Sequence, residues 1–102
     1  MYGTIARLRI KPGGTEALKA TMAKYDDVDV PGSVATYVYR MDADPNEHML
    51  VVLFEDRESY RRNAQDPAQD ERYRAMLEFL DGEPEWHDGE VVWASEGPTT
   101  SG

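Results

Sequence analysis

The sequence contains no cysteine, and this absence excludes three kinds of chemistry. A disulfide framework, a thiolate metal site and a cysteine nucleophile all need that residue. A chain without cysteine also fits a reducing compartment, so we expect a cytoplasmic protein. Residues 1–7 agree with this expectation, because they have neither the basic start nor the apolar run of a signal peptide.

Long apolar runs are missing as well, and no stretch approaches the ~20 apolar residues that span a bilayer. Basic residues are few. Eleven Lys and Arg stand against twenty Asp and Glu, which leaves a formal net charge of −9. This charge opposes phosphate backbones and anionic lipids, so we expect neither nucleic acid nor a membrane as a partner. A chain of 102 residues fits one domain better than two.

Periodic patterns of apolar residues predict four strands and three helices. The first strand shows period-two alternation, and the first helix has an apolar stripe at Leu18, Met22 and Tyr25. Asp66 and Pro67 form a helix entry signal, with an N-cap side chain followed by proline at the first helical position. The predicted strands are 2–11, 33–41, 48–55 and 85–94, and the predicted helices are 15–26, 56–65 and 66–81.

The order of these elements predicts an α+β fold of the ferredoxin-like βαββαβ type. In that fold, the helices cover one face of a four-stranded antiparallel sheet. We expect one domain over residues 1–95 and a flexible tail over residues 96–102. Trp93, in the last predicted strand, is expected in the core. Trp86 and His87 are expected in a turn or bulge that enters this strand.

The sheet face away from the helices predicts a homodimer. Residues 49–54 are apolar without alternation, which is typical of a strand covered on both faces. Either the odd-numbered or the even-numbered residues of this run face outward, together with either Val34 and Val38 or Tyr37 and Tyr39. An exposed apolar patch of that size is uncommon on a monomer, and two-fold pairing is the commonest way to cover it.

Two arginines and two histidines leave alternatives open. Arg7 and Arg9 share one strand face, where they could form salt bridges across a dimer or meet an anionic substrate. His48 begins the third strand and is either a general base or a solvated side chain. Neither His48 nor His87 belongs to a metal-ligand spacing such as HxxxH, so we expect no metal site.

Residues 2–14 resemble the opening strand and turn of the antibiotic biosynthesis monooxygenase family. Residues 54–60, which close the third strand, and the helix entry at Asp66 and Pro67 resemble the same family. The resemblance extends over residues 2–94. It implies a dimeric α+β barrel with a pocket between the sheet and the helices of each subunit.

Members of this family do different things. Some oxygenate aromatic polyketides without metal or flavin, whereas others with a similar fold bind and degrade haem. The haem branch has an asparagine on the first strand, a tryptophan near the second helix and a histidine on the following helix. This sequence has Thr4, Tyr60 and Tyr73 there, so the resemblance implies no haem, and we expect no cofactor.

The cofactor-free branch uses asparagine, tryptophan, tyrosine and arginine. Its chemistry needs a phenol-like substrate in a dry pocket and a group that favours the substrate anion, which gives electrons to O₂. The matching candidates are Tyr60, Asn63, Arg72 and Tyr73, with His48 as a possible base, and no tryptophan lies in that stretch.

These observations predict a small homodimeric, cofactor-independent monooxygenase acting on an aromatic or polyketide-like molecule. Two alternatives stay open. The first is a non-catalytic dimer that binds a ligand or assists a pathway, and the second is an isomerase or cyclase that acts by proton transfer.

Overall fold

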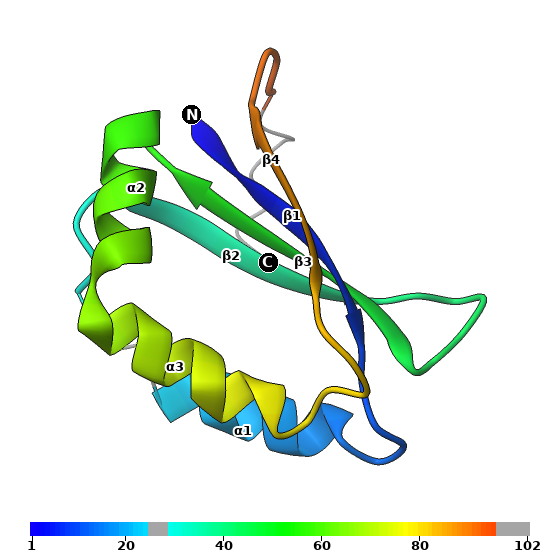
Figure 1. The fold of residues 1–102 in the computed structure, drawn as a ribbon. Helices are drawn as coiled ribbons and strands as arrows, with labels where there is room; N and C mark the ends of the chain where they lie inside the picture. The colour runs from blue at the N-terminus through cyan, green and yellow to red at the C-terminus, as the bar shows by residue number, and fades with distance from the viewer. Residues whose placement is uncertain (25–28, 96–102) are drawn as a thin grey trace, which may run out of the picture.

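The computed structural model describes residues 1–24 and 29–95, which form one sheet covered on one face by three helices (Figure 1). The strands and helices follow one another along the chain in the order that the sequence predicts. Their bounds are β1 Tyr2–Arg9, α1 Thr15–Lys24, β2 Ser33–Arg40, β3 Glu47–Phe54, α2 Arg57–Gln65, α3 Pro67–Leu77 and β4 Glu85–Glu90.

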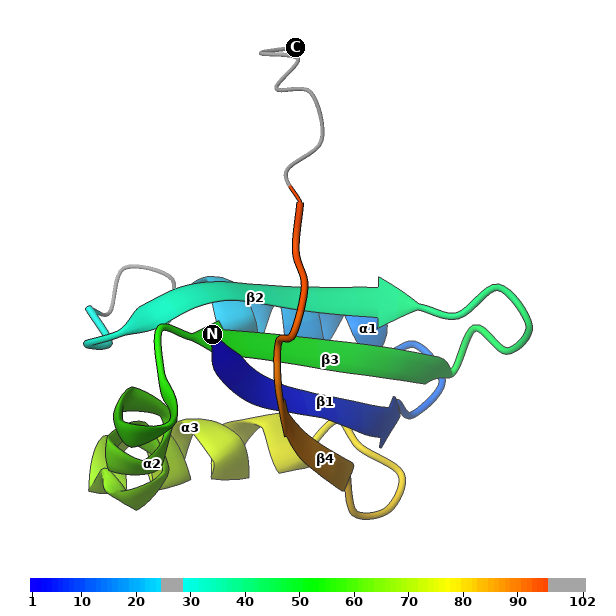
Figure 2. The same ribbon diagram turned by 90° about the horizontal axis from the view of Figure 1, so that it is seen from above.

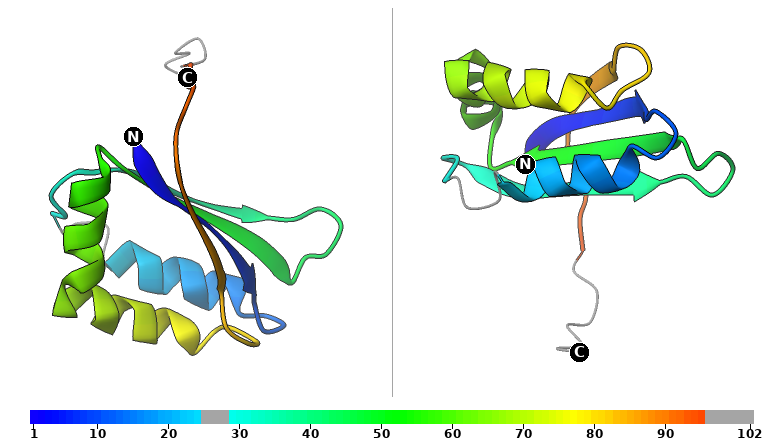
Figure 3. Two further views of the ribbon diagram at one scale, coloured as in Figure 1. Left: turned by 45° about the horizontal axis from the view of Figure 1, so that its top comes forward. Right: turned by 90° about the horizontal axis from the view of Figure 1, so that it is seen from below.

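The sheet has the strand order β2-β3-β1-β4, and every neighbouring pair is antiparallel. This order places the first and third strands in the centre, so the two βαβ halves interleave. The α+β, ferredoxin-like prediction is confirmed. All helices lie on one side of the sheet, as the two views of Figure 3 show. The opposite face, which we call the outer face, is seen in Figure 2.

Local sequence signals explain where the helices begin. The Asp56 carboxylate accepts a 2.8 Å hydrogen bond from the Ser59 amide and caps α2. The Asp66 carboxylate accepts a 2.9 Å hydrogen bond from the Ala68 amide, and Pro67 occupies the first position of α3. The predicted entry signal is therefore confirmed, since proline at this position loses no helical hydrogen bond.

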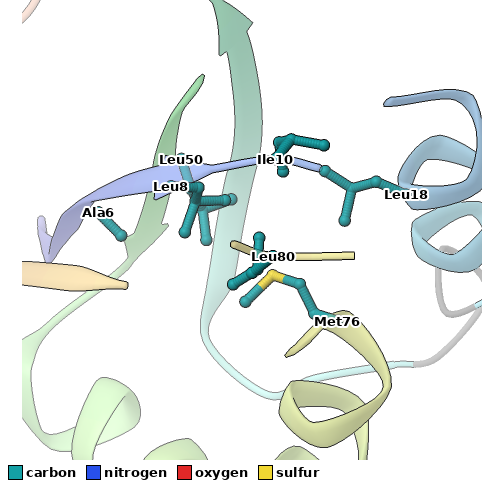
Figure 4. Packing of buried hydrophobic residues seen from close by; sticks show 7 residues of the cluster. All are labelled: Ala6, Leu8, Ile10, Leu18, Leu50, Met76 and Leu80. Carbon is teal, nitrogen blue, oxygen red and sulfur yellow. The ribbon is translucent and has the colours of Figure 1, made fainter. Parts of the chain in front are cut away.

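The core lies between β1, β3 and the helices (Figure 4). Alternate residues of β1 point inward because successive side chains of a strand lie on opposite faces. Leu18 of α1 and Met76 of α3 close over them from the helix layer. The buried apolar cluster consists of Ala6, Leu8, Ile10, Leu18, Leu50, Met76 and Leu80.

The strand register shows which side chains face outward. Ile5 of β1 pairs with Val51 of β3, and Val51 pairs with Tyr37 of β2. Paired residues point to the same face, so the odd-numbered residues of β3 lie on the outer face with Tyr37 and Tyr39. The even-numbered residues of β3 face the helices. Within one chain, the outer face of β3 is only partly covered.

Three predictions about the C-terminal part are wrong. Trp93 is not in the core, because its exposed fraction is 79%. Strand β4 ends at Glu90 rather than at residue 94. The Val91 amide still donates to the Met1 carbonyl, and beyond this bond the chain turns away from the sheet. No bulge is present at Trp86 and His87, where β4 pairs with β1 in regular register.

Other bounds differ slightly from the predicted ones. Helix α3 ends at Leu77, four residues earlier than predicted, because the Phe79 and Leu80 amides bond to carbonyls three residues back. The last two residues of the predicted first helix, Tyr25 and Asp26, and the predicted tail 96–102 lie outside the described residues. None of the described helices is long and apolar enough to cross a membrane. The cytoplasmic location stays a prediction.

Candidate functional site

A tyrosine and an aspartate join α2 to β4 on the helix side of the sheet. The Tyr60 hydroxyl donates a 2.8 Å hydrogen bond to Asp88 Oδ1. Tyr60 lies one turn after the Asp56 cap, which fixes the start of α2. Asp88 pairs with the buried Thr4 of β1, so its side chain points to the helix side. The bond therefore spans two elements that are 28 residues apart in the sequence.

Aromatic rings surround this hydrogen bond. The Tyr60 ring meets Tyr2 with ring centroids 5.3 Å apart and Phe54 with centroids 5.7 Å apart, both edge-to-face. Farther along β4, the Tyr73 ring of α3 lies 5.8 Å from the Trp86 ring. Trp86 is two residues before Asp88, so both side chains lie on the helix side of β4. We call these five residues the aromatic cluster; they are Tyr2, Phe54, Tyr60, Tyr73 and Trp86.

The environment of Tyr60 keeps its hydroxyl protonated. Partial burial disfavours the phenolate, and the hydrogen bond to Asp88 together with the charge of Asp88 raises the pKa of Tyr60 further, to about 12. The neighbouring Thr4 hydroxyl acts in the opposite direction. At neutral pH, Tyr60 is consequently a hydrogen-bond donor and not a base. Asp88 is exposed and acceptor-only when ionised.

Thr4 adds an unusual polar atom beside this pair. Its side chain is buried, and Thr4 Oγ1 has no hydrogen-bond partner among the described residues. A buried hydroxyl without a partner costs free energy, so this group calls for an explanation such as an ordered water or a catalytic role.

A cleft of about 220 Å³ lies at the corner where α2 meets α3. Arg72 is held there by Gln69, whose Oε1 accepts from Arg72 Nη2 at 3.0 Å and from Nε at 3.2 Å. Asn63 Oδ1 is 3.4 Å from the same Nη2 atom. The described lining residues are Asp29, Val30, Pro31, Ser59, Arg62, Asn63, Asp66, Ala68 and Arg72.

The predicted site residues thus form two groups. Tyr60 and Tyr73 belong to the aromatic cluster, whereas Asn63 and Arg72 line the cleft. Ser59, which precedes Tyr60, also lines the cleft, so the groups adjoin along α2. The structure brings Asn63 and Arg72 together, whereas Tyr60 and Tyr73 contact different aromatic rings, and the four side chains do not share one pocket.

His48 is separate from both groups. It lies on the helix side of β3, four residues from Val52, which pairs with Thr4. Four strand residues span roughly 13 Å. The expectation of a solvated side chain is wrong, because His48 is 1% exposed. Its Nε2 lies 3.3 Å from Thr15 Oγ1, and Nδ1 has no partner among the described residues.

Sequence reasoning missed Trp86 and Asp88. The resemblance suggests a tryptophan near the second helix, and here Trp86 of β4 supplies an indole ring beside Tyr73 of α3. The signal that could have revealed the pair is the alternation of residues 85–90. Trp86 and Asp88 take one face, while Glu85 and His87 take the other and bond to each other at 3.1 Å.

Charged residues gather at one end of the outer face. Arg7 forms an ion pair with Glu47 of the same chain, and this bond raises the pKa of Arg7. Arg9 lies 3.6 Å from Asp44. These pairs are exposed, so each contributes little to stability. A second cavity of about 220 Å³ is lined there by Arg7, Arg9, Glu47, Asp81, Glu83 and Glu85.

Solved structures show how widespread this fold is. A proposed antibiotic biosynthesis monooxygenase from Bordetella bronchiseptica is similar with a TM-score of 0.77 and 20% identity, covering 90% of this chain and 97% of that one. A proposed family protein from Chloroflexus aurantiacus gives 0.74 and 21%, covering 93% and 96%. SnoaB, a cofactor-independent oxygenase from Streptomyces nogalater, gives 0.72 and 18%, covering 91% and 94%.

Similarity at these identities supports the fold alone. No curated protein matches the sequence. The family model for antibiotic biosynthesis monooxygenase matches residues 1–78, which include β1 through α3. The chain therefore belongs to the antibiotic biosynthesis monooxygenase family.

Proposed function

We propose that this protein is a homodimeric, cofactor-independent monooxygenase that oxidises an aromatic or polyketide-like small molecule. The observation that carries the proposal is the Tyr60–Asp88 hydrogen bond within the aromatic cluster. Membership of the family and the similarity to SnoaB, a cofactor-independent oxygenase, support it.

The aromatic cluster offers what an electron-rich ring compound needs. Tyr73 and Trp86 present ring surfaces on which such a compound can stack. Tyr60, which stays protonated, donates a hydrogen bond to the oxygen of the substrate anion and stabilises its negative charge. Asp88 holds Tyr60 in place and, once the substrate displaces this bond, accepts the substrate proton.

The neighbouring cleft extends this site. We assign to Asn63 and Arg72 the binding of polar substituents on the same compound, because an amide and a guanidinium recognise carbonyl and carboxylate oxygens. His48 is not included in the proposed site, since it is buried and lies roughly 13 Å along β3 from Val52, the residue that pairs with Thr4.

The reaction balances with O₂ as the co-reactant. An anthrone methylene loses its two hydrogen atoms and gains one oxygen atom to become a carbonyl. The second oxygen atom leaves with those two hydrogens as water. Electrons pass from the substrate anion to O₂, so the protein supplies binding, orientation and hydrogen bonds.

The homodimer is proposed from the outer face of the sheet. Ile5, Tyr37 and Tyr39 lie together there and are between 47% and 56% exposed. Tyrosine is enriched at protein interfaces, and a two-fold dimer covers this surface with an identical one. The charged end of the face, which carries both arginines and carboxylates, is self-complementary in such a pairing.

A second candidate function is ligand binding without turnover. The exposure of Asp88 favours it, because a site open to water stabilises charge less well than a dry one. The distinguishing experiment measures O₂ uptake by chelator-treated protein with a panel of anthrones and hydroquinones. For an anthrone, the proposal expects one O₂ consumed per anthraquinone formed.

The other outcomes are equally informative. Tight binding without O₂ uptake supports the accessory protein, and conversion of the substrate without O₂ uptake supports an isomerase or cyclase. Neither binding nor uptake across the panel contradicts the proposal.

A further inference from the structure

Thr4 places a polar group at a core position of the sheet. Its exposed fraction is 4%, and it lies on the helix side of β1. Valine has the same branched shape without the hydroxyl, so it would fit this strand position without the cost of burying a polar group. The next inward residues of the strand are apolar and buried; they are Ala6, Leu8 and Ile10. The hydroxyl of Thr4 therefore calls for a reason other than packing.

This hydroxyl lies beside the hydrogen bond between Tyr60 and Asp88. Figure 1 shows β1 between β3 and β4, with α2 near the N-terminal end of β1. Thr4 pairs with Asp88 across β1 and β4, so both side chains stand on the same face with Cβ atoms roughly 5 Å apart. Asp88 in turn accepts the 2.8 Å bond from Tyr60. One helix and two strands thus bring three polar groups together.

The Thr4 hydroxyl favours negative charge on the Tyr60 oxygen. Burial and the bond to Asp88 raise the pKa of Tyr60, whereas Thr4 lowers it, because a hydroxyl can donate to a phenolate oxygen. The titratable groups that face Tyr60 include Asp88 of β4 and Tyr2 of β1. Thr4 Oγ1 nevertheless makes no hydrogen bond to any residue that the structure describes. Its donor is therefore available when more charge develops on the Tyr60 oxygen.

We propose that Thr4 is a positioning residue for the proposed oxidation: its hydroxyl donates to the Tyr60 oxygen when Tyr60 donates to the substrate anion. This inference rests on the proposed function and adds a residue to it. Hydrogen bonds in a chain strengthen one another, so a donor behind Tyr60 makes Tyr60 a stronger donor to the anion. Neither hydroxyl loses its proton, and only the directions of their hydrogen bonds change. Thr4 acts through Tyr60 and does not touch the substrate.

Thr4→Val separates this role from a structural one. The variant keeps the shape of the side chain and removes a buried hydroxyl without a described partner, so the urea midpoint should stay the same or rise. Thr4→Ser keeps the hydroxyl. The matched control is Thr36→Val, which makes the same change two strands away on the same sheet face, since Val52 pairs with both threonines.

A phenol that is already a quinone measures the effect without turnover. The probe is 2-hydroxyanthraquinone, whose phenolate absorbs at longer wavelengths than its phenol, so a visible absorbance titration gives the pKa of the bound probe. We expect a higher probe pKa with Thr4→Val than with the wild type. At equal pH, its ratio of anion to phenol should be about 3- to 10-fold lower. Thr4→Ser should restore the ratio, and Thr36→Val should leave it unchanged.

A double-mutant cycle tests whether Thr4 acts through Tyr60. In a Tyr60→Phe background, Thr4→Val should have no further effect on the probe, because the oxygen that accepts from Thr4 is gone. An equal effect of Thr4→Val in both backgrounds would show that the side chain acts on the ligand directly or through packing. That result would overturn the inference.

The oxidation and the role of Thr4 can fail separately. With an anthrone, Thr4→Val should lower kcat about 3- to 10-fold and change KM little. If the wild type consumes O₂ but Thr4→Val matches it in rate and in probe pKa, the inference is overturned and the oxidation stands. If O₂ uptake is absent and the probe still responds to Thr4 through Tyr60, the oxidation fails and the hydrogen-bond chain to a bound anion stands. Wild-type protein that does not favour the probe anion overturns the inference.

Discussion

The hydroxyl group of Tyr60 and the carboxylate of Asp88 are 2.8 Å apart, although the two residues belong to a helix and an edge strand. This bond connects helix α2 to the last strand of the βαββαβ fold. It also lies within the aromatic cluster, so the same contact that positions β4 supplies the polar groups of the proposed site.

The Tyr60–Asp88 bond predicts a specific pH dependence of stability. The pKa of Tyr60 is about 12 in the folded protein and about 10 in an unfolded chain. Between these values the native state retains the proton that the unfolded state loses. The contribution of this group to the free energy of unfolding is therefore constant below pH ~10, and it is lost as the pH rises from ~10 through ~12.

Denaturant unfolding between pH 8 and 12 measures this effect. Tyr60→Phe should remove this group's contribution to the alkaline loss, and Asp88→Asn should lower the pKa of Tyr60 in an ultraviolet titration. The effect will be smaller than full burial would give, because Tyr60 is partly exposed. An unchanged tyrosine titration in Asp88→Asn would show that the bond does not set this pKa.

Substitution of Gly32 by alanine should cause a severe packing defect. Its φ is +82°, and a Cβ atom there would lie 2.4 Å from the Cβ and Oγ atoms of Ser59 in α2. Gly32→Ala combines a left-handed backbone cost with this clash, so it should lower the free energy of unfolding by about 2–4 kcal/mol.

Gly13→Ala is the matched control for this substitution. Its φ is +79°, and a Cβ atom added there would have no other heavy atom within 4 Å. It should therefore lose only the backbone part, about 1 kcal/mol. Equal losses in urea unfolding of the two variants would contradict the close contact between Gly32 and Ser59.

Substitution of His48 by leucine should cost less stability than substitution by alanine. Its Nδ1 atom is buried without a partner among the described residues, and an apolar side chain of similar size removes that cost. His48→Leu should change the free energy of unfolding by less than about 1 kcal/mol. His48→Ala leaves a cavity and should cost about 2–3 kcal/mol. If both variants lose the same stability in urea, a specific role for the imidazole is indicated.

Tyr37 tests the proposed dimer interface. Tyr37→Lys places a charge on the outer face and should raise the dimer dissociation constant about 100-fold, because an interface core disfavours an unpaired charge. Thr36→Lys places the same charge on the other face of β2, where the side chain is also exposed. Light scattering should give a dimer for Thr36→Lys and a monomer for Tyr37→Lys at low micromolar concentration.

Period-two and helical patterns were sufficient to predict the fold. The inward residues of β1 and the cap at Asp66 are local signals, and the structure uses both as the sequence suggests. Trp93 was misplaced because an apolar run gives no sign of where a strand leaves its sheet. That departure depends on the end of β1, where the ladder has no further partner.

The candidate site was harder to predict because its parts are distant in sequence. Tyr60 was found through the family resemblance, but Asp88 joins it only after β4 pairs with β1. Asn63 and Arg72 were expected in the same pocket as Tyr60. The direction of each side chain around α2 and α3 separates them, and this direction depends on how the helices pack.

The proposed oxidation is tested most directly by O₂ uptake of matched tyrosine variants with an anthrone substrate. The wild type and Tyr39→Phe, which lacks a hydroxyl on the outer face, should consume O₂ at similar rates. Tyr60→Phe should be about 100-fold slower, because it loses the donor to the substrate anion. Wild-type protein without O₂ uptake, or Tyr60→Phe at the wild-type rate, would contradict the proposal.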